Sequence, residues 1–165
     1  MVIRKIIALL ESLIENPSEG LPEDIFLFIS RITPIINVDL LIKNEHNHTL
    51  LTWRDDDYHP PGWHIPGGIV RYKDTVARRI SAVAVSELGA EIEFEEDPLA
   101  INEVIHSSRK NRGHFISLLY ECRLISSLDK DIRYETGIPK PGEWAWHGKC
   151  PEDIIPAHEM YREFL

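Results

Sequence analysis

The chain has 165 residues, which is enough for one domain with a hydrophobic core of its own. Its 27 acidic and 18 basic residues give a net charge of −9, which repels the phosphate backbone of nucleic acid, so we expect no nucleic-acid partner. With only Cys122 and Cys150, and no run approaching the ~20 apolar residues that span a bilayer, the sequence predicts a cytoplasmic protein without a disulfide framework, a zinc site or a membrane span.

The first predicted element is an amphipathic helix. Its apolar residues recur at spacings of three and four and share one face: Ile3, Ile6, Ile7, Leu10, Leu13 and Ile14. Residues 17–21 have the composition of a hinge, so we divide the chain into an N-terminal helical arm, residues 1–20, and a second unit, residues 21–165. The apolar face of the arm needs a partner, which is either the body of the same chain or a second copy in a homodimer.

Residues 22–62 predict a short helix and a hairpin. Pro22, followed by Glu23 and Asp24, suits the first turn of a helix over residues 22–31. Residues 34–44 are rich in β-branched and apolar side chains, and residues 50–53 are predicted to pair with them as a hairpin. The stretch RDDDYHPPG, residues 54–62, has loop composition.

The clearest helix is predicted over residues 74–88. The segment lacks proline and glycine, carries Val76, Ile80 and Val83 at helical spacing, and is followed by Gly89, a typical C-cap. We interpret Asp74, which comes before the apolar pattern, as the N-cap.

Three further strands are predicted at residues 91–95, 99–106 and 115–124, and the stretch GEWAW predicts a last short strand. Residues 153–165 predict one or two terminal helices, broken by Pro156. Since the strands surround one central helix, we expect an α+β fold, an α/β/α sandwich with a mixed β-sheet and an added N-terminal helix.

Gly67 and Gly68 follow a proline and precede the central helix at a fixed distance. They predict either a tight turn or a place where the backbone approaches a ligand and offers a carbonyl oxygen to a hard cation. Glu87 in the last turn of the helix opposes the helix dipole and therefore favours a neighbouring cation. With the glycines at this spacing, we interpret Glu87 as a metal ligand.

Residues 68–89 resemble the box of the Nudix hydrolase family, G-x5-E-x7-R-E-U-x-E-E-x-G-U, where U is aliphatic. The match consists of Gly68, Gly89 and Glu87, with Asp74 as a shortened match for the first glutamate. In place of the charged residues of the family, this chain has Ala82, Val83 and Ser86. The resemblance implies a Nudix-like fold and a hydrolase that uses Mg²⁺ or Mn²⁺. A similarly thinned box is found in the GDP-mannose mannosyl hydrolase branch, where one ion stabilises the departing nucleoside diphosphate and water attacks the sugar carbon.

The resemblance to that branch covers most of residues 22–165 and implies roles for individual side chains. Gly67, through its carbonyl, and Glu87 would hold the metal. Arg54 would stabilise the diphosphate leaving group, and His114, at a loop-to-strand junction, would be the general base. Asp39 has a counterpart in the first strand of the branch and would contact substrate. The charge of the arginine that the branch has after its glycines would come from Arg71 or from Arg79.

The expected function is therefore the hydrolysis of a nucleoside diphosphate-linked small molecule, such as a nucleotide sugar. One alternative is attack at phosphorus, with Glu103 or Glu121 supplying the missing carboxylates; another is a non-catalytic domain that binds a nucleotide or a partner protein. A basic loop that contains Arg109, Lys110 and Arg112 is either a phosphate-binding loop or a solvated hairpin tip.

Overall fold

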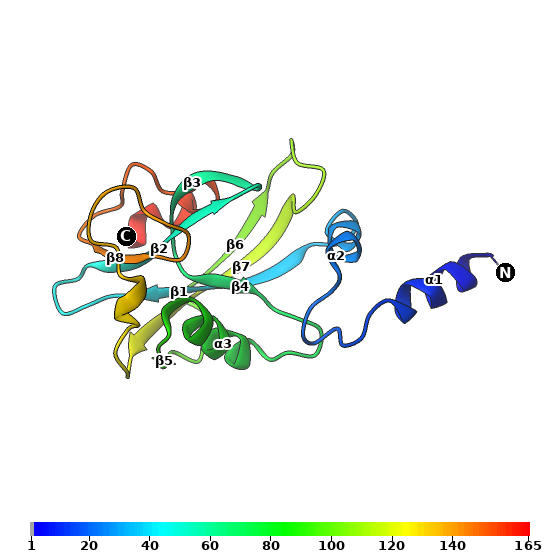
Figure 1. Cartoon of the computed structure of the whole chain (residues 1–165), viewed down its shortest axis with the longest axis horizontal. Helices are drawn as coiled ribbons and strands as arrows, with labels where there is room; N and C mark the ends of the chain where they lie inside the picture. Colours follow the sequence, from blue (N-terminus) through cyan, green and yellow to red (C-terminus); the bar gives the residue numbers. More distant parts are fainter. Residues whose placement is uncertain (1) are drawn as a thin grey trace.

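A computed structural model describes residues 2–165, which form two sheets with helices around them (Figure 1). Sheet A has the strand order β4-β1-β7-β5, with β6 also pairing with β7; sheet B has the order β3-β2-β8. The strands are β1 (Ile35–Ile42), β2 (Thr49–Asp56), β3 (His59–His64), β4 (Gly67–Ile69), β5 (Ile92–Phe94), β6 (Ala100–Ile105), β7 (His114–Leu124) and β8 (Trp144–His147). Among the paired strands of residues 2–165, β1 and β7 alone are parallel, so the predicted α+β class and mixed sheet are confirmed.

The helix α3 (Val76–Leu88) covers one face of sheet A. Its buried residues pack against alternate residues of β1, among them Val38 and Leu40. The other face of sheet A carries Leu41 and Leu119, which pack with residues of sheet B and of the C-terminal 3-10 helix η2 (Pro156–Phe164). A polar group that lies between α3, sheet A and sheet B is therefore screened from solvent on several sides.

Two sequence predictions for the first strands are wrong. β1 and β2 do not form a hairpin, because they share only the bridge Lys43–Thr49 before β1 pairs with β4 and β7 and β2 joins sheet B. The expected loop over residues 54–62 is instead the end of β2 and most of β3. Pro60 and Pro61 fit there because β3 is an edge strand, and the pairing with β2 is irregular between Arg54 and Asp56.

The helix boundaries agree closely with those predicted from the sequence, with two corrections. The N-cap of α3 is Thr75, whose hydroxyl accepts from the Arg78 N–H at 3.1 Å, while Asp74 lies 3.4 Å from the Arg78 guanidinium. Gly89 adopts φ = 60° at the C-cap, as predicted. Pro156 does not break a terminal helix but stands in the first turn of η2, where its missing N–H costs nothing.

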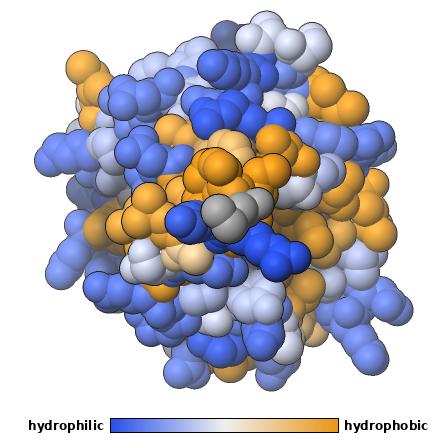
Figure 2. Space-filling view, turned by 90° about the vertical axis from the view of Figure 1, so that its right-hand side faces the viewer, coloured by the Kyte–Doolittle hydropathy of each residue, from blue (hydrophilic) through white to orange (hydrophobic). Residues whose placement is uncertain are grey.

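The arm contains α1 (Val2–Ser12) and is followed by α2 (Glu23–Ile29); a short 3-10 helix, η1 (Lys130–Ile132), precedes β8. Figure 1 shows α1 projecting away from both sheets, and none of its residues is buried. Apolar side chains gather on the arm and around its base in the view along it (Figure 2). Met1 of the predicted arm lies outside the described residues, and no helix in residues 2–165 has the length and apolar character needed to cross a membrane.

Candidate active site

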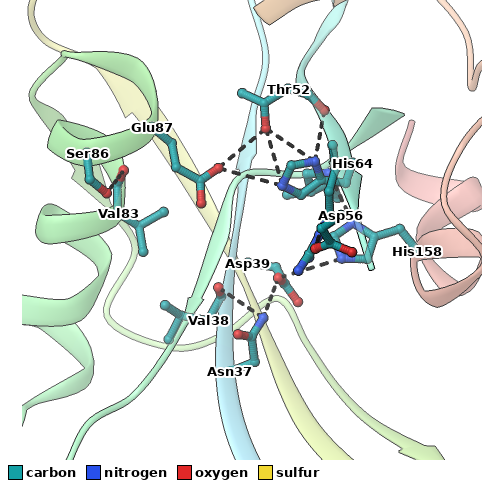
Figure 3. Close-up of polar contacts among 12 residues, drawn as sticks. Asn37, Val38, Asp39, Thr52, Asp56, His64, Val83, Ser86, Glu87 and His158 are labelled. Carbon is teal, nitrogen blue, oxygen red and sulfur yellow. Dashed lines mark hydrogen bonds and ion pairs between the residues drawn. The ribbon is translucent and has the colours of Figure 1, made fainter. Parts of the chain in front are cut away.

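The last turn of α3 brings Glu87 to the junction of the two sheets (Figure 3). Its carboxylate accepts a hydrogen bond from the backbone N–H of Gly67, and Oε2 lies 3.4 Å from the hydroxyl of Thr52 and 3.7 Å from Nε2 of His64. Burial raises the pKa of Glu87 to about 7, in spite of the Gly67 hydrogen bond, which lowers it. Glu87 is thus a partly buried carboxylate, with 28% of its side chain exposed.

The two glycines allow this close assembly. A Cβ on Gly67 would collide with the carboxylate of Asp39, and a Cβ on Gly68 would lie 2.7 Å from Cγ2 of Val83 on α3. β4 therefore lies against both β1 and α3 only because these positions lack side chains.

His64 has a fixed tautomer. Its Nδ1 lies 2.8 Å from the carbonyl oxygen of Thr52, which can only accept, so Nδ1 carries the proton and Nε2 is a bare lone pair. Burial, as the largest cause, and the nearby Arg54 guanidinium together lower the pKa of His64 to about 3, so the ring is neutral at pH 7. The lone pair of His64 and the Glu87 carboxylate face each other, an arrangement that favours a cation or a shared proton between them.

A second carboxylate, that of Asp39, lies deeper in the protein than Glu87. Its Oδ2 accepts from the Tyr161 hydroxyl at 2.6 Å and its Oδ1 from the Asn37 amide at 2.6 Å, and the residue is 1% exposed. Burial raises the pKa of Asp39 to about 7. His158 accepts the Ile65 N–H on Nδ1 at 3.0 Å, which leaves its protonated Nε2 directed at Asp39, 4.0 Å away.

A hollow of about 450 Å³ opens above Glu87 and is lined also by Arg54, His64 and Gly67. Arg54 extends from β2 and is hydrogen-bonded to Asp56. A second hollow of about 510 Å³ lies far along sheet A, between β5 and the start of the β1–β2 turn, and carries none of the predicted site residues except Glu121.

Four of the six predicted site residues come together: Asp39, Arg54, Gly67 and Glu87. His114 does not join them. Phe115 and Ser117 line the space beside Asn37 and His158, so strand alternation directs His114 to the opposite face of sheet A, where its Nε2 lies 3.1 Å from Oε1 of Glu103.

Arg71 is also apart from the group. Its guanidinium donates to the carbonyl of Glu19, near the base of the arm. Glu103 and Glu121, which were alternatives for the missing carboxylates, lie on that opposite face and at the distant hollow respectively. Within residues 2–165 no three His, Cys, Asp or Glu side chains gather as a metal site.

Three residues of the group received no role from the sequence: His64, His158 and Tyr161. His64 could have been suspected, because it ends the strand immediately before the Pro-Gly-Gly turn. No local pattern could have placed His158 and Tyr161, because their partners Ile65 and Asp39 are 93 and 122 residues away in the chain.

The chain was also compared with known proteins. The model of the NUDIX domain family matches residues 33–148. The low-salt glycan biosynthesis protein Agl8 of Haloferax volcanii is 31% identical over 125 residues, which are 73% of this chain and 79% of Agl8.

Solved structures agree on the fold. The MutT protein of Methanosarcina mazei Go1 matches with a TM-score of 0.58 and 20% identity, over 81% of this chain and 91% of that one. A NUDIX hydrolase of Nitrosomonas europaea matches with a TM-score of 0.58 and 21% identity, over 80% of this chain and 68% of that one. At these identities the likeness establishes the fold.

Proposed function

The chain belongs to the NUDIX family, and on this premise we propose that it is a metal-dependent hydrolase of a nucleoside diphosphate-linked substrate. The substrate is a nucleotide sugar such as GDP-mannose, water attacks the sugar carbon, and nucleoside diphosphate is released. The relative named for glycan biosynthesis supports a sugar-linked substrate.

The observation that carries the proposal is the single carboxylate that α3 presents to the hollow. Val83 is part of the core, and the hydroxyl of Ser86 donates to the Val83 carbonyl, so neither position adds a ligand beside Glu87. One carboxylate cannot gather the several cations that attack at phosphorus uses. Departure of a diphosphate from carbon requires mainly that negative charge on the leaving group be stabilised, because the transition state resembles an oxocarbenium ion.

The donors at the hollow fit a single hard cation. Glu87 and the Gly67 carbonyl would hold Mg²⁺ or Mn²⁺ together with oxygen atoms of the substrate, and the face-to-face arrangement of Glu87 and His64 favours positive charge there. When bound, the ion would neutralise charge on the diphosphate.

The other residues act directly on the substrate or through their neighbours. Arg54, which lines the hollow, would hold diphosphate oxygen atoms with its planar guanidinium. Asp39 is too buried to reach the substrate, so it would orient Asn37 and His158, which reach the adjoining space. His114 would not act as the base, because its imidazole lies on the other face of sheet A.

The test is hydrolysis of a nucleotide-sugar panel, GDP-mannose included, with Mg²⁺ or Mn²⁺ and with chelator. We expect turnover only with metal, and a loss of about 100-fold or more in kcat for Glu87→Gln. Glu91→Gln is the matched control, because Glu91 is an exposed glutamate just beyond the same helix. Unchanged turnover in Glu87→Gln would contradict the assignment, and no turnover of any substrate by the wild type would favour a binding domain.

A further inference from the structure

A smaller hollow of about 60 Å³ adjoins the site on the side away from α3. Arg54 lines both hollows, so its guanidinium lies where they meet. The small hollow is also lined by His59 of β3 and by His106 and Arg112 of the β6–β7 loop. Its size suits a compact chemical group and not a nucleobase.

The charge around this hollow is positive, although the chain has a net charge of −9. None of the residues that line it is a carboxylate. The hollow is lined by Arg54 and Arg112, while Arg109, which does not line it, lies against the imidazole of His59; the carboxylate of Asp56 also acts on that ring. Burial, as the largest cause, and the three guanidinium groups lower the pKa of His59 to about 4 although Asp56 raises it, so the ring adds no charge of its own at pH 7.

Only Arg54 among these three arginines has a carboxylate partner, Asp56. Within residues 2–165, Arg109 and Arg112 take part in no ion pair. The two guanidinium groups nevertheless have defined neighbours. That of Arg109 lies 3.3 to 3.5 Å from the ring nitrogens of His59, and that of Arg112 stacks 4.2 Å from the ring centre of Tyr58.

The backbone also holds Arg112 in place. Its N–H donates to the hydroxyl of Ser30 at 3.1 Å, and the residue adopts φ = 51°, which a non-glycine residue takes up only where the surroundings require it. Partial burial lowers the pKa of Arg112, as does the nearby Arg54, so a positive charge is kept here against some cost. An anion would remove that cost.

We propose, resting on the proposed function and deepening it, that His59 and Arg112 in the small hollow, together with Arg109 against His59, form a second anion subsite. The subsite holds a phosphate or carboxylate group on the part of the substrate beyond the diphosphate. Guanidinium groups match both oxyanions geometrically, and a phosphate or carboxylate is compact enough for the hollow. The preferred substrates would then carry an acidic sugar or one more phosphate, with Arg54 contacting the diphosphate between the two hollows.

The first test uses inorganic phosphate alone and needs no turnover. The rise in melting temperature on adding phosphate, against chloride at equal ionic strength, is measured without metal. We expect a rise in the wild type and in Glu87→Gln, and its loss in Arg112→Gln and in Arg109→Gln. Arg109→Gln serves as a second variant in case loss of the Arg112 stacking destabilises the fold. Lys110→Gln is the matched control, because Lys110 is an exposed cation of the same loop.

A phosphate effect that is absent in the wild type, or unchanged in both arginine variants, would overturn the proposal. Because this readout is independent of catalysis, it separates the subsite from the proposed function. Phosphate binding with no hydrolysis of any nucleotide sugar would leave the subsite standing and remove the hydrolase.

The second test identifies the source of the anion by calorimetric binding with Mg²⁺. UDP-glucuronic acid is compared with UDP-glucose, and GTP with GDP. We expect the more anionic member of one pair to bind about tenfold or more tightly, and Arg112→Gln to remove that advantage. Tighter binding of UDP-glucuronic acid than of UDP-glucose indicates that the subsite holds an acidic sugar. Tighter binding of GTP than of GDP indicates that it holds a further phosphate. An equal loss for both members of each pair would place Arg112 on the diphosphate itself and overturn the subsite.

Discussion

Glu87 and His64 bring two electron-rich atoms within 3.7 Å of each other, with 28% of the Glu87 side chain and 10% of the His64 side chain exposed. His64 does not relieve the contact by taking up a proton, since burial keeps its ring neutral, whereas the raised pKa of Glu87 allows that carboxylate to take one up. The family spacing allowed Glu87 and Gly67 to be predicted, because both belong to one glycine-to-helix segment. The partners of Glu87 could not be predicted in the same way, since Thr52 and His64 approach it only through the tertiary fold.

The raised pKa of Glu87 makes a prediction about stability. The folded chain raises that pKa from 4.5 to about 7, so between these pH values the folded state keeps a proton that the unfolded state releases. This contribution to stability is present below pH 4.5 and is lost as the pH rises through 7. In metal-free protein, Glu87→Gln should therefore melt at a higher temperature than the wild type above pH 7, and the two melting curves should converge below pH 4.5. A difference that grows toward low pH would contradict the shift.

At the level of elements, α3 was predictable because its apolar period and its C-cap are local features. The β1–β2 hairpin was mispredicted because β1 takes its partner from β7, about 80 residues later, and no local pattern reports that pairing. The contacts of η2 with the site could not be predicted either, because they also join residues that are far apart in the chain. Its Tyr161 is fully buried and donates to Asp39 on β1.

Removing that hydroxyl should destabilise the chain. Tyr161→Phe leaves the buried Asp39 with one hydrogen bond fewer, which we expect to cost about 1–3 kcal/mol of unfolding free energy. Urea denaturation at pH 8, where Asp39 is mostly charged, measures the loss. Tyr134→Phe is the control, because the Tyr134 hydroxyl bonds a carbonyl at the exposed surface. Equal stability of the two variants would mean that η2 does not support Asp39.

On the scale of the whole molecule, the arm is the part that the body leaves uncovered. Sequence periodicity correctly predicted an amphipathic helix, but Ile3, Ile6 and Leu13 are 72%, 53% and 57% exposed, so the same chain does not bury this face. The helix carries Arg4 and Lys5 near its start and Glu11 near its end. Two copies packed antiparallel would bring opposite charges together beside their apolar faces.

We therefore expect the arm to join two copies. Light scattering of the full chain should give twice the 19.0 kDa mass of one chain, and a shortened chain that begins at Gly20 should give a single mass. Leu13→Glu tests the apolar face without removing the arm, and Ser12→Glu, at an exposed polar position, is its control. A mass that is the same with and without residues 1–19 would show that the arm does not join subunits.

The most direct test of attack at the sugar carbon is hydrolysis in ¹⁸O-water of a nucleotide sugar that the chain turns over. The measurement is which product carries the ¹⁸O label. The single carboxylate on α3 and the absence of Glu103 and Glu121 from the site predict that ¹⁸O enters the released sugar and not the phosphate. His114→Gln should give the same labelling at nearly the wild-type rate, because its imidazole faces away from the site. Label in the nucleotide or sugar phosphate would contradict the account and assign this chain to attack at phosphorus.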